Sequence, residues 1–177
     1  MIQNRQRSAL PVFAPCEDLI VAVLRDYFAD KFITVSSEFY EGMETPAVVV
    51  HQHSNTGDGS TYRSWRFTAN TVISIDVLTL GPDADQEAGQ LHEAVRLALY
   101  ESLFDSKVYP GLGHLTKVTH GTRATRVNDW ATSSGAVQYA SLPNDAARHE
   151  AVYRIRYAPD ADQSRVENPF VRQRQAY

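Results

Sequence analysis

A run of alternating side chains between residues 65 and 77 constrains the fold more than any other feature of the chain. Every second position is apolar or β-branched, and the positions between are mostly polar. Successive side chains of a β-strand point to opposite faces of the sheet, so this period of two predicts one long strand with a single buried face. The buried set would be Trp65, Phe67, Ala69, Thr71, Ile73, Ile75 and Val77.

Two helices are predicted on either side of this strand. Paired apolar residues recur every four positions between residues 19 and 28, directly after Pro15, which indicates one broad buried helix face. A second helix is expected from Asp83, a favourable N-cap residue, with Gln86 completing a capping box. Its buried stripe would be Ala84, Ala88, Leu91, Val95, Ala98 and Ser102, widened by Leu99 and Leu103.

Further β-prone segments complete the sheet. They are Phe32–Val35, Ala47–His51, Leu115–Val127 and Ala151–Tyr157. The polar stretch 53–60 reads as a loop that joins the second of these to the long strand in a projecting hairpin. The fold class is therefore α+β: a mostly antiparallel sheet of about four to five strands, with two helices packed on one face and extended terminal arms.

The length of 177 residues fits one domain. We expect an N-terminal arm over residues 1–14, a single α+β domain over 15–157 and a C-terminal arm over 158–177. The formal net charge of −4 argues against a general nucleic-acid binder, which carries a basic surplus. No secretory signal and no apolar run of about 20 residues is present, so we expect synthesis in the cytoplasm and no membrane partner.

Two side-chain types, histidine and cysteine, are candidates for catalysis or metal binding. His51 and His53 are two residues apart on a predicted strand, so both side chains point to one face and could bind one metal ion. No acidic or cysteine residue lies at a spacing typical of a further metal ligand, which favours exposed or interface histidines. Cys16 lies near a helix start, yet nothing nominates a general base beside it, so a small residue at the N-terminal end of the helix is the favoured interpretation. His92 is predicted on the helix surface. We accordingly predict no catalytic residue, no metal, no cofactor and no enzymatic activity.

Arginines indicate a candidate interface more clearly than the histidines or the cysteine indicate chemistry. Arg154 and Arg156 alternate with Tyr153 and Ile155, so the two cations should share the sheet face opposite the buried one. This face is either solvated or an interface where arginine meets a neighbour's carboxylates or DNA. The candidate partner-interface residues are His53, Asn55, Asp58, Arg63, Trp65, Arg154, Arg156 and Phe170.

Five segments, taken in order, carry a resemblance to a known family. They are Glu17–Leu24 of the first helix, Pro46–Val50, Ile73–Val77, Asp85–Leu91 of the second helix and Tyr153–Tyr157. In order and spacing they resemble the tail-terminator proteins of long-tailed bacteriophages, particularly the siphophages of actinobacteria.

The resemblance extends over about residues 15–157. It implies a virion structural protein that forms a hexameric ring on the tail tube, ends tail polymerisation and joins the tail to the head connector. The implied partners are further copies of the chain, the tail tube protein, the connector or stopper protein, and phage DNA passing through the lumen without sequence-specific binding. Alternatives are another head–tail connector protein, such as a stopper or head-completion protein, and a small enzyme or ligand-binding domain.

Overall fold

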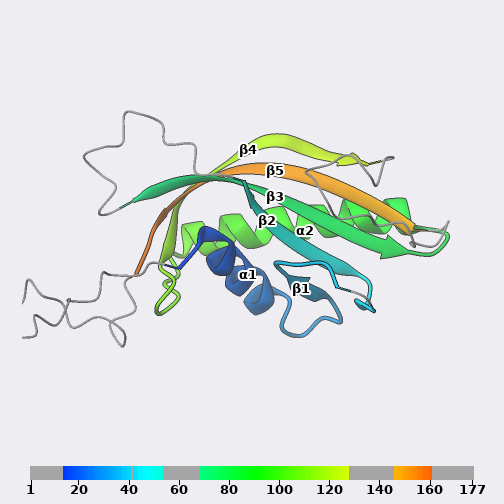
Figure 1. Cartoon of the computed structure of the whole chain (residues 1–177), viewed down its shortest axis with the longest axis horizontal. Coiled ribbons are helices and arrows are strands. Elements are labelled where there is room, and N and C mark those ends of the chain that lie inside the picture. The colour runs from blue at the N-terminus through cyan, green and yellow to red at the C-terminus, as the bar shows by residue number, and fades with distance from the viewer. Residues whose placement is uncertain (1–13, 41, 54–67, 128–145, 161–177) are drawn as a thin grey trace, which may run out of the picture.

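The computed structural model describes residues 14–40, 42–53, 68–127 and 146–160. These residues form a five-stranded sheet with two helices against one face (Figure 1). The elements in chain order are α1 (Cys16–Tyr27), β1 (Thr34–Ser36), β2 (Ala47–His53), β3 (Ala69–Leu80), α2 (Ala84–Phe104), β4 (His114–Arg126) and β5 (Ala146–Ala158). The predicted α+β class, with a mostly antiparallel sheet, is confirmed.

The strand order is β1-β2-β3-β5-β4, so the last strand lies between β3 and β4. β1 runs parallel to β2, and the other neighbouring pairs are antiparallel. The β3–β5 register is continuous from Ala69 opposite Tyr157 to Leu80 opposite Ala146. This ladder forms the middle of the sheet, and α2 crosses beneath it to connect β3 with β4.

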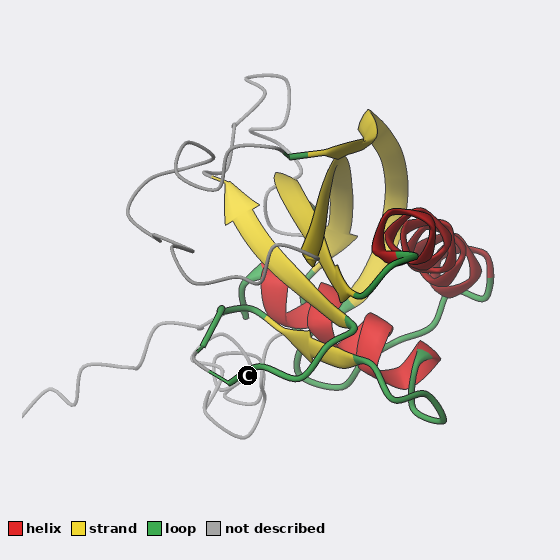
Figure 2. Ribbon diagram, turned by 90° about the vertical axis from the view of Figure 1, so that its right-hand side faces the viewer, coloured by secondary structure: helices red, strands yellow, loops and turns green. Residues whose placement is uncertain are grey.

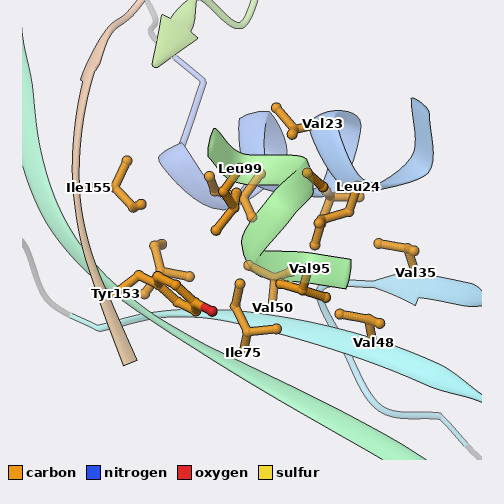
Figure 3. Close-up of a cluster of buried hydrophobic side chains, with 14 of the residues drawn as sticks. Val23, Leu24, Val35, Val48, Val50, Ile75, Val95, Leu99, Tyr153 and Ile155 are labelled. Atoms are coloured by element: carbon orange, nitrogen blue, oxygen red, sulfur yellow. The ribbon is translucent and has the colours of Figure 1, made fainter. Parts of the chain in front are cut away.

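The main core lies between the sheet and the two helices (Figure 3). Ile75 of β3 and Tyr153 of β5 face Val95 and Leu99 of α2, and all four are 0–1% exposed. The buried stripe predicted for α2 is confirmed from Ala84 to Ser102. Figure 2 shows α2 nearly end-on, with the strands to one side of it.

The prediction of a single buried face on the long strand is wrong. Ile73, Ile75 and Val77 face the helices as expected, but Ser74 and Asp76 on the opposite face are also buried. A second, smaller cluster covers part of that face. It contains Ala47, Val49 and Leu78, with Phe39 and Met43 packed against it. The segment between β1 and β2 therefore buries a part of the sheet that alternation alone assigned to solvent.

Several element boundaries also differ from the predictions. β5 begins at Ala146, five residues before the predicted start, because residues 146–150 continue the ladder with β3. β1 begins at Thr34 and leaves Phe32 fully exposed. At the start of α2, the Asp83 side chain makes no capping hydrogen bond. Residues 65–67 of the predicted long strand lie outside the described part of the chain.

A matched pair of leucines on α2 tests this packing. Leu99 is fully buried, so Leu99→Ala should lower the free energy of unfolding by about 2–5 kcal/mol through lost contacts and a cavity. Leu97 is 43% exposed, and Leu97→Ala should change it by no more than about 0.5 kcal/mol. Urea unfolding followed by circular dichroism measures both. Equal losses in the two variants would contradict the placement of α2.

Candidate functional site

The sheet face turned away from the helices, called here the outer sheet face, brings three predicted interface residues together. His53 lies opposite Val72 of β3, which in turn lies opposite Arg154 of β5. Arg156 occupies the next outward position of β5, and Tyr153 and Ile155 between them are buried in the core. The expected sharing of one face by Arg154 and Arg156 is thus what the structure shows.

Lys117 of β4 joins the two arginines to form a cluster that we call the cationic sheet patch. Its members, Lys117, Arg154 and Arg156, are all exposed. Lys117 lies directly opposite Arg156 in the β4–β5 ladder, and like charges in that position repel. The Arg156 side chain donates from Nε to Oδ1 of Asn70 at 2.9 Å, which positions the guanidinium without neutralising it.

No carboxylate within the described residues forms an ion pair with this patch. Glu150 is the nearest carboxylate along β5 that shares its face. It lies four residues before Arg154, a separation of about 13 Å along a strand. The patch therefore presents uncompensated positive charge. Such a surface can hold an anionic partner, and nothing in its geometry suggests a reaction.

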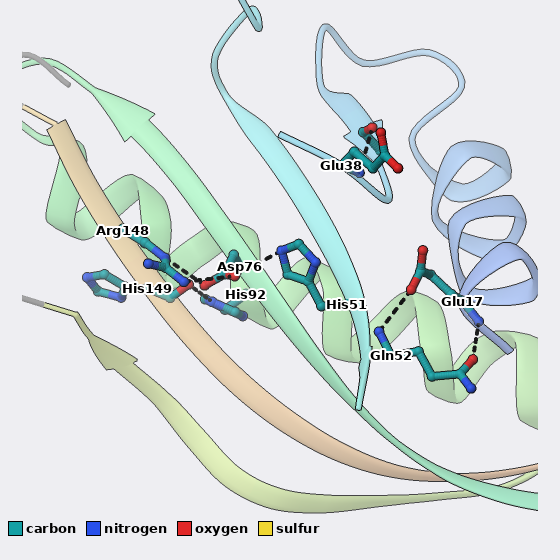
Figure 4. A network of polar contacts seen from close by, with 9 residues as sticks. Glu17, Glu38, His51, Gln52, Asp76, His92, Arg148 and His149 are labelled. Atoms are coloured by element: carbon teal, nitrogen blue, oxygen red, sulfur yellow. Dashed lines mark hydrogen bonds and ion pairs between the residues drawn. The ribbon is translucent and has the colours of Figure 1, made fainter. Parts of the chain in front are cut away.

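A buried ion pair lies further along the same face (Figure 4). Arg148 of β5 donates from Nε and Nη2 to the two carboxylate oxygens of Asp76 at 2.9 and 3.1 Å. The two side chains are 2% and 1% exposed, and the ring of His51 approaches the same carboxylate at 3.6 Å. Two parallel hydrogen bonds between a guanidinium and a carboxylate fix the relative position of β3 and β5 as well as balancing charge.

Sequence reasoning missed this pair. Alternation places Asp76 on the face of the long strand that is expected to meet solvent, and Arg148 precedes the predicted strand Ala151–Tyr157. The available signal was a single carboxylate within the otherwise uncharged run 69–80, because such a group needs a partner when its sheet is covered on both faces.

A histidine pair joins α2 to β5 on the helix side of the sheet. The side chain of His92 bonds through Nε2 to the backbone oxygen of His149 at 3.0 Å, and the His149 ring meets Asp85 at 3.0 Å. The prediction that His92 lies on the helix surface is wrong, since it is only 4% exposed. It occupies the position beside Leu91, on the side of α2 that meets the start of β5, and that strand begins earlier than predicted.

The electrostatics of this pair follow from its surroundings. Burial lowers the pKa of His92, so the ring stays neutral and donates its Nε2 proton to the carbonyl of His149. The pKa of Asp85 is lowered, first by its hydrogen bond with His149 and also by the charge of Arg126. Asp85 thus remains a carboxylate that connects α2 with β4 and β5.

The other candidates for chemistry are placed as follows. Cys16 is the first residue of α1, as favoured, and it is fully buried, which raises the pKa of its thiol so that the protonated form persists. Within the described ranges no group of three or more His, Cys, Asp or Glu side chains is arranged to hold a metal ion. Five predicted interface residues, Asn55, Asp58, Arg63, Trp65 and Phe170, lie outside the described residues.

A comparison of the chain with protein-family models and with curated protein sequences found no match. In the part of the chain that the structure describes, neither helix is long and apolar enough to cross a membrane.

Removing the buried carboxylate of Asp76 should destabilise the fold far more than removing an exposed carboxylate. Asp76→Asn leaves the buried guanidinium of Arg148 without its carboxylate, and should lower the free energy of unfolding by about 3–5 kcal/mol. Asp26→Asn, which removes an exposed ion pair with Lys107, is the matched control and should cost far less. Chemical unfolding of both variants measures the two losses of unfolding free energy. Similar losses in the two variants would contradict a structural role for Asp76.

Burial of His92 predicts a pH dependence of stability. Its pKa in the folded chain lies below the usual value of about 6.5, so the unfolded chain binds more protons as the pH falls through that value. Stability should therefore be greatest above about pH 6.5 and decline below it, with a slope from this residue of up to about 1.4 kcal/mol per pH unit. His92→Gln should flatten the decline between about pH 7 and 5, measured by urea unfolding. If stability falls with pH as steeply in His92→Gln as in the wild type, His92 is not the cause of the decline.

Proposed function

We propose that this chain is a phage virion structural protein of the tail-terminator type. In this proposal several copies, six by the family resemblance, form a ring on the end of the tail tube. The ring ends tube polymerisation and offers a surface to the head connector, while DNA passes through its lumen. The protein acts by assembly at the head–tail junction, and no catalysis is required of it.

The order of the elements is the observation that carries the proposal. The chain runs α1, then β2 paired with β3, then α2, then β4 paired with β5. The five segments on which the resemblance rests follow this order and belong to α1, β2, β3, α2 and β5. The resemblance was drawn from sequence spacing, and the described fold places those segments in one sheet with both helices on one face.

The distribution of polar groups gives independent support. The cationic sheet patch places like charges opposite each other on an exposed face, at an electrostatic cost within a single copy. An anionic partner on that face would relieve the repulsion. A protein that works by assembly needs exposed faces of this kind, whereas a small-molecule site needs converging polar groups in a concave pocket.

The positions of the chain ends also suit assembly. Residue 14 precedes α1, and residue 160 follows β5, at the same end of the molecule (Figure 1). Near that end the Asp160 side chain accepts a hydrogen bond from the Gly111 backbone at 3.3 Å. The two ends of the described domain thus lie on one side of it.

Deleting the gene from its phage tests the proposal. A tail terminator limits tube length, so its loss should give abnormally long or headless tails in electron micrographs, restored to normal by the wild-type chain supplied from a plasmid. Tails of normal length beside heads that leak DNA would contradict the terminator role and indicate a stopper or head-completion protein instead.

A further inference from the structure

The charges of this chain are divided between its two layers. The two helices contain seven carboxylates and two arginines, whereas the five strands contain six basic side chains and two carboxylates. The chain as a whole carries a formal charge of −4, which conceals this separation. One layer of the molecule is acidic and the other basic, so two copies attract each other when the helices of one meet the sheet of the next.

The acidic layer has a defined exposed stripe on α2. Positions spaced by alternating steps of three and four lie on one side of a helix. On the side of α2 away from the core the exposed positions of this spacing are Glu87, Gln90, Leu97, Glu101 and Phe104, which we call the outer stripe of α2. Leu97 and Phe104 are 43% and 80% exposed, and neither Glu87 nor Glu101 forms an ion pair with any described residue. The stripe thus combines free carboxylates with exposed apolar side chains.

The cationic sheet patch has the complementary composition. Two half-buried valines, Val72 and Val152, share its face and lie beside the strand positions of Arg154. Lys117, Arg154 and Arg156 supply the positive charge. The outer stripe of α2 thus combines apolar side chains with carboxylates, and the cationic sheet patch combines apolar side chains with cations.

We infer that the outer stripe of α2 in one copy docks on the cationic sheet patch of the next copy. The inference rests on the proposed ring and specifies how its subunits meet. The two surfaces lie on opposite layers of the molecule, so the contact is head-to-tail and every copy uses both. A head-to-tail contact closes into a ring when its rotation allows, and otherwise continues as a filament.

A second copy fits the patch better than nucleic acid does. Affinity for duplex DNA depends on the number of phosphates that lysine and arginine side chains neutralise. The patch supplies three cations. A sugar–phosphate backbone would also leave its valines without apolar contact, whereas Leu97 and Phe104 of the outer stripe provide that contact.

Charge reversal in the full-length chain tests the inference. Variant one carries Arg154→Glu and Arg156→Glu, and variant two carries Glu87→Lys and Glu101→Lys. The control carries Asp30→Lys and Glu38→Lys, two exposed sites outside the stripe with the same charge change as variant two. Circular dichroism confirms folding, and light scattering over a concentration series gives the assembly state.

The inference predicts that each reversal raises the concentration needed for assembly at least about tenfold, because each juxtaposes like charges, while the control assembles as the wild type does. An equal mixture of the two variants should assemble again. In the mixture, every acidic face can meet a basic one when the two variants alternate.

Three other results would overturn the inference. If the wild type assembles and both reversals assemble equally well, the stripe–patch contact is wrong and the ring proposal stands. If variant one assembles normally but loses binding to duplex DNA that the wild type shows, the patch serves nucleic acid instead. If the wild type never assembles, in solution or on purified tail tubes, the ring proposal itself fails and the contact with it.

Discussion

The pairing of β3 with β5 is the constraint on which the other features depend. Twelve residue pairs run without interruption from Ala69 opposite Tyr157 to Leu80 opposite Ala146. This register turns Tyr153, Ile155 and Tyr157 toward the helices and Arg154 and Arg156 away from them. A slip of one residue would exchange the two sets, burying the arginines and exposing the core. In this register Asp76 and Arg148 are diagonal neighbours across the two strands, and their bidentate contact adds to the stability of the pairing.

Sequence periodicity predicted the parts of the fold in which one face is apolar and the other polar. It identified both helices, the buried stripe of α2 and the alternation over residues 151–157 of β5, because each of these segments has one main buried face. Periodicity failed where both faces of the sheet are covered by other parts of the chain. The second cluster around Val49 and Leu78 depends on Phe39 and Met43, which come from a segment without regular spacing. The order of the strands also depends on tertiary pairing, and no local pattern reveals that β5 lies between β3 and β4.

The candidate site was foreseen in part for the same reason. Arg154 and Arg156 lie on an alternating strand, so their common face could be predicted. Lys117 joins them only through the register between β4 and β5, which includes irregularities that a sequence does not show. The outer stripe of α2 follows from helical spacing once the opposite stripe is known to be buried. The separation of charge between layers becomes visible only when the fold assigns each residue to a helix or a strand.

Self-assembly is the central claim, because both the proposed role at the head–tail junction and the contact between layers require it. Light scattering of the purified wild-type chain, combined with negative-stain imaging in the presence of isolated tail tubes, measures it most directly. The proposal predicts closed rings of uniform size, free in solution or seated on the ends of tubes, with a mass that is a whole multiple of one copy. A chain that stays monomeric at every concentration and leaves the tube ends bare would contradict it.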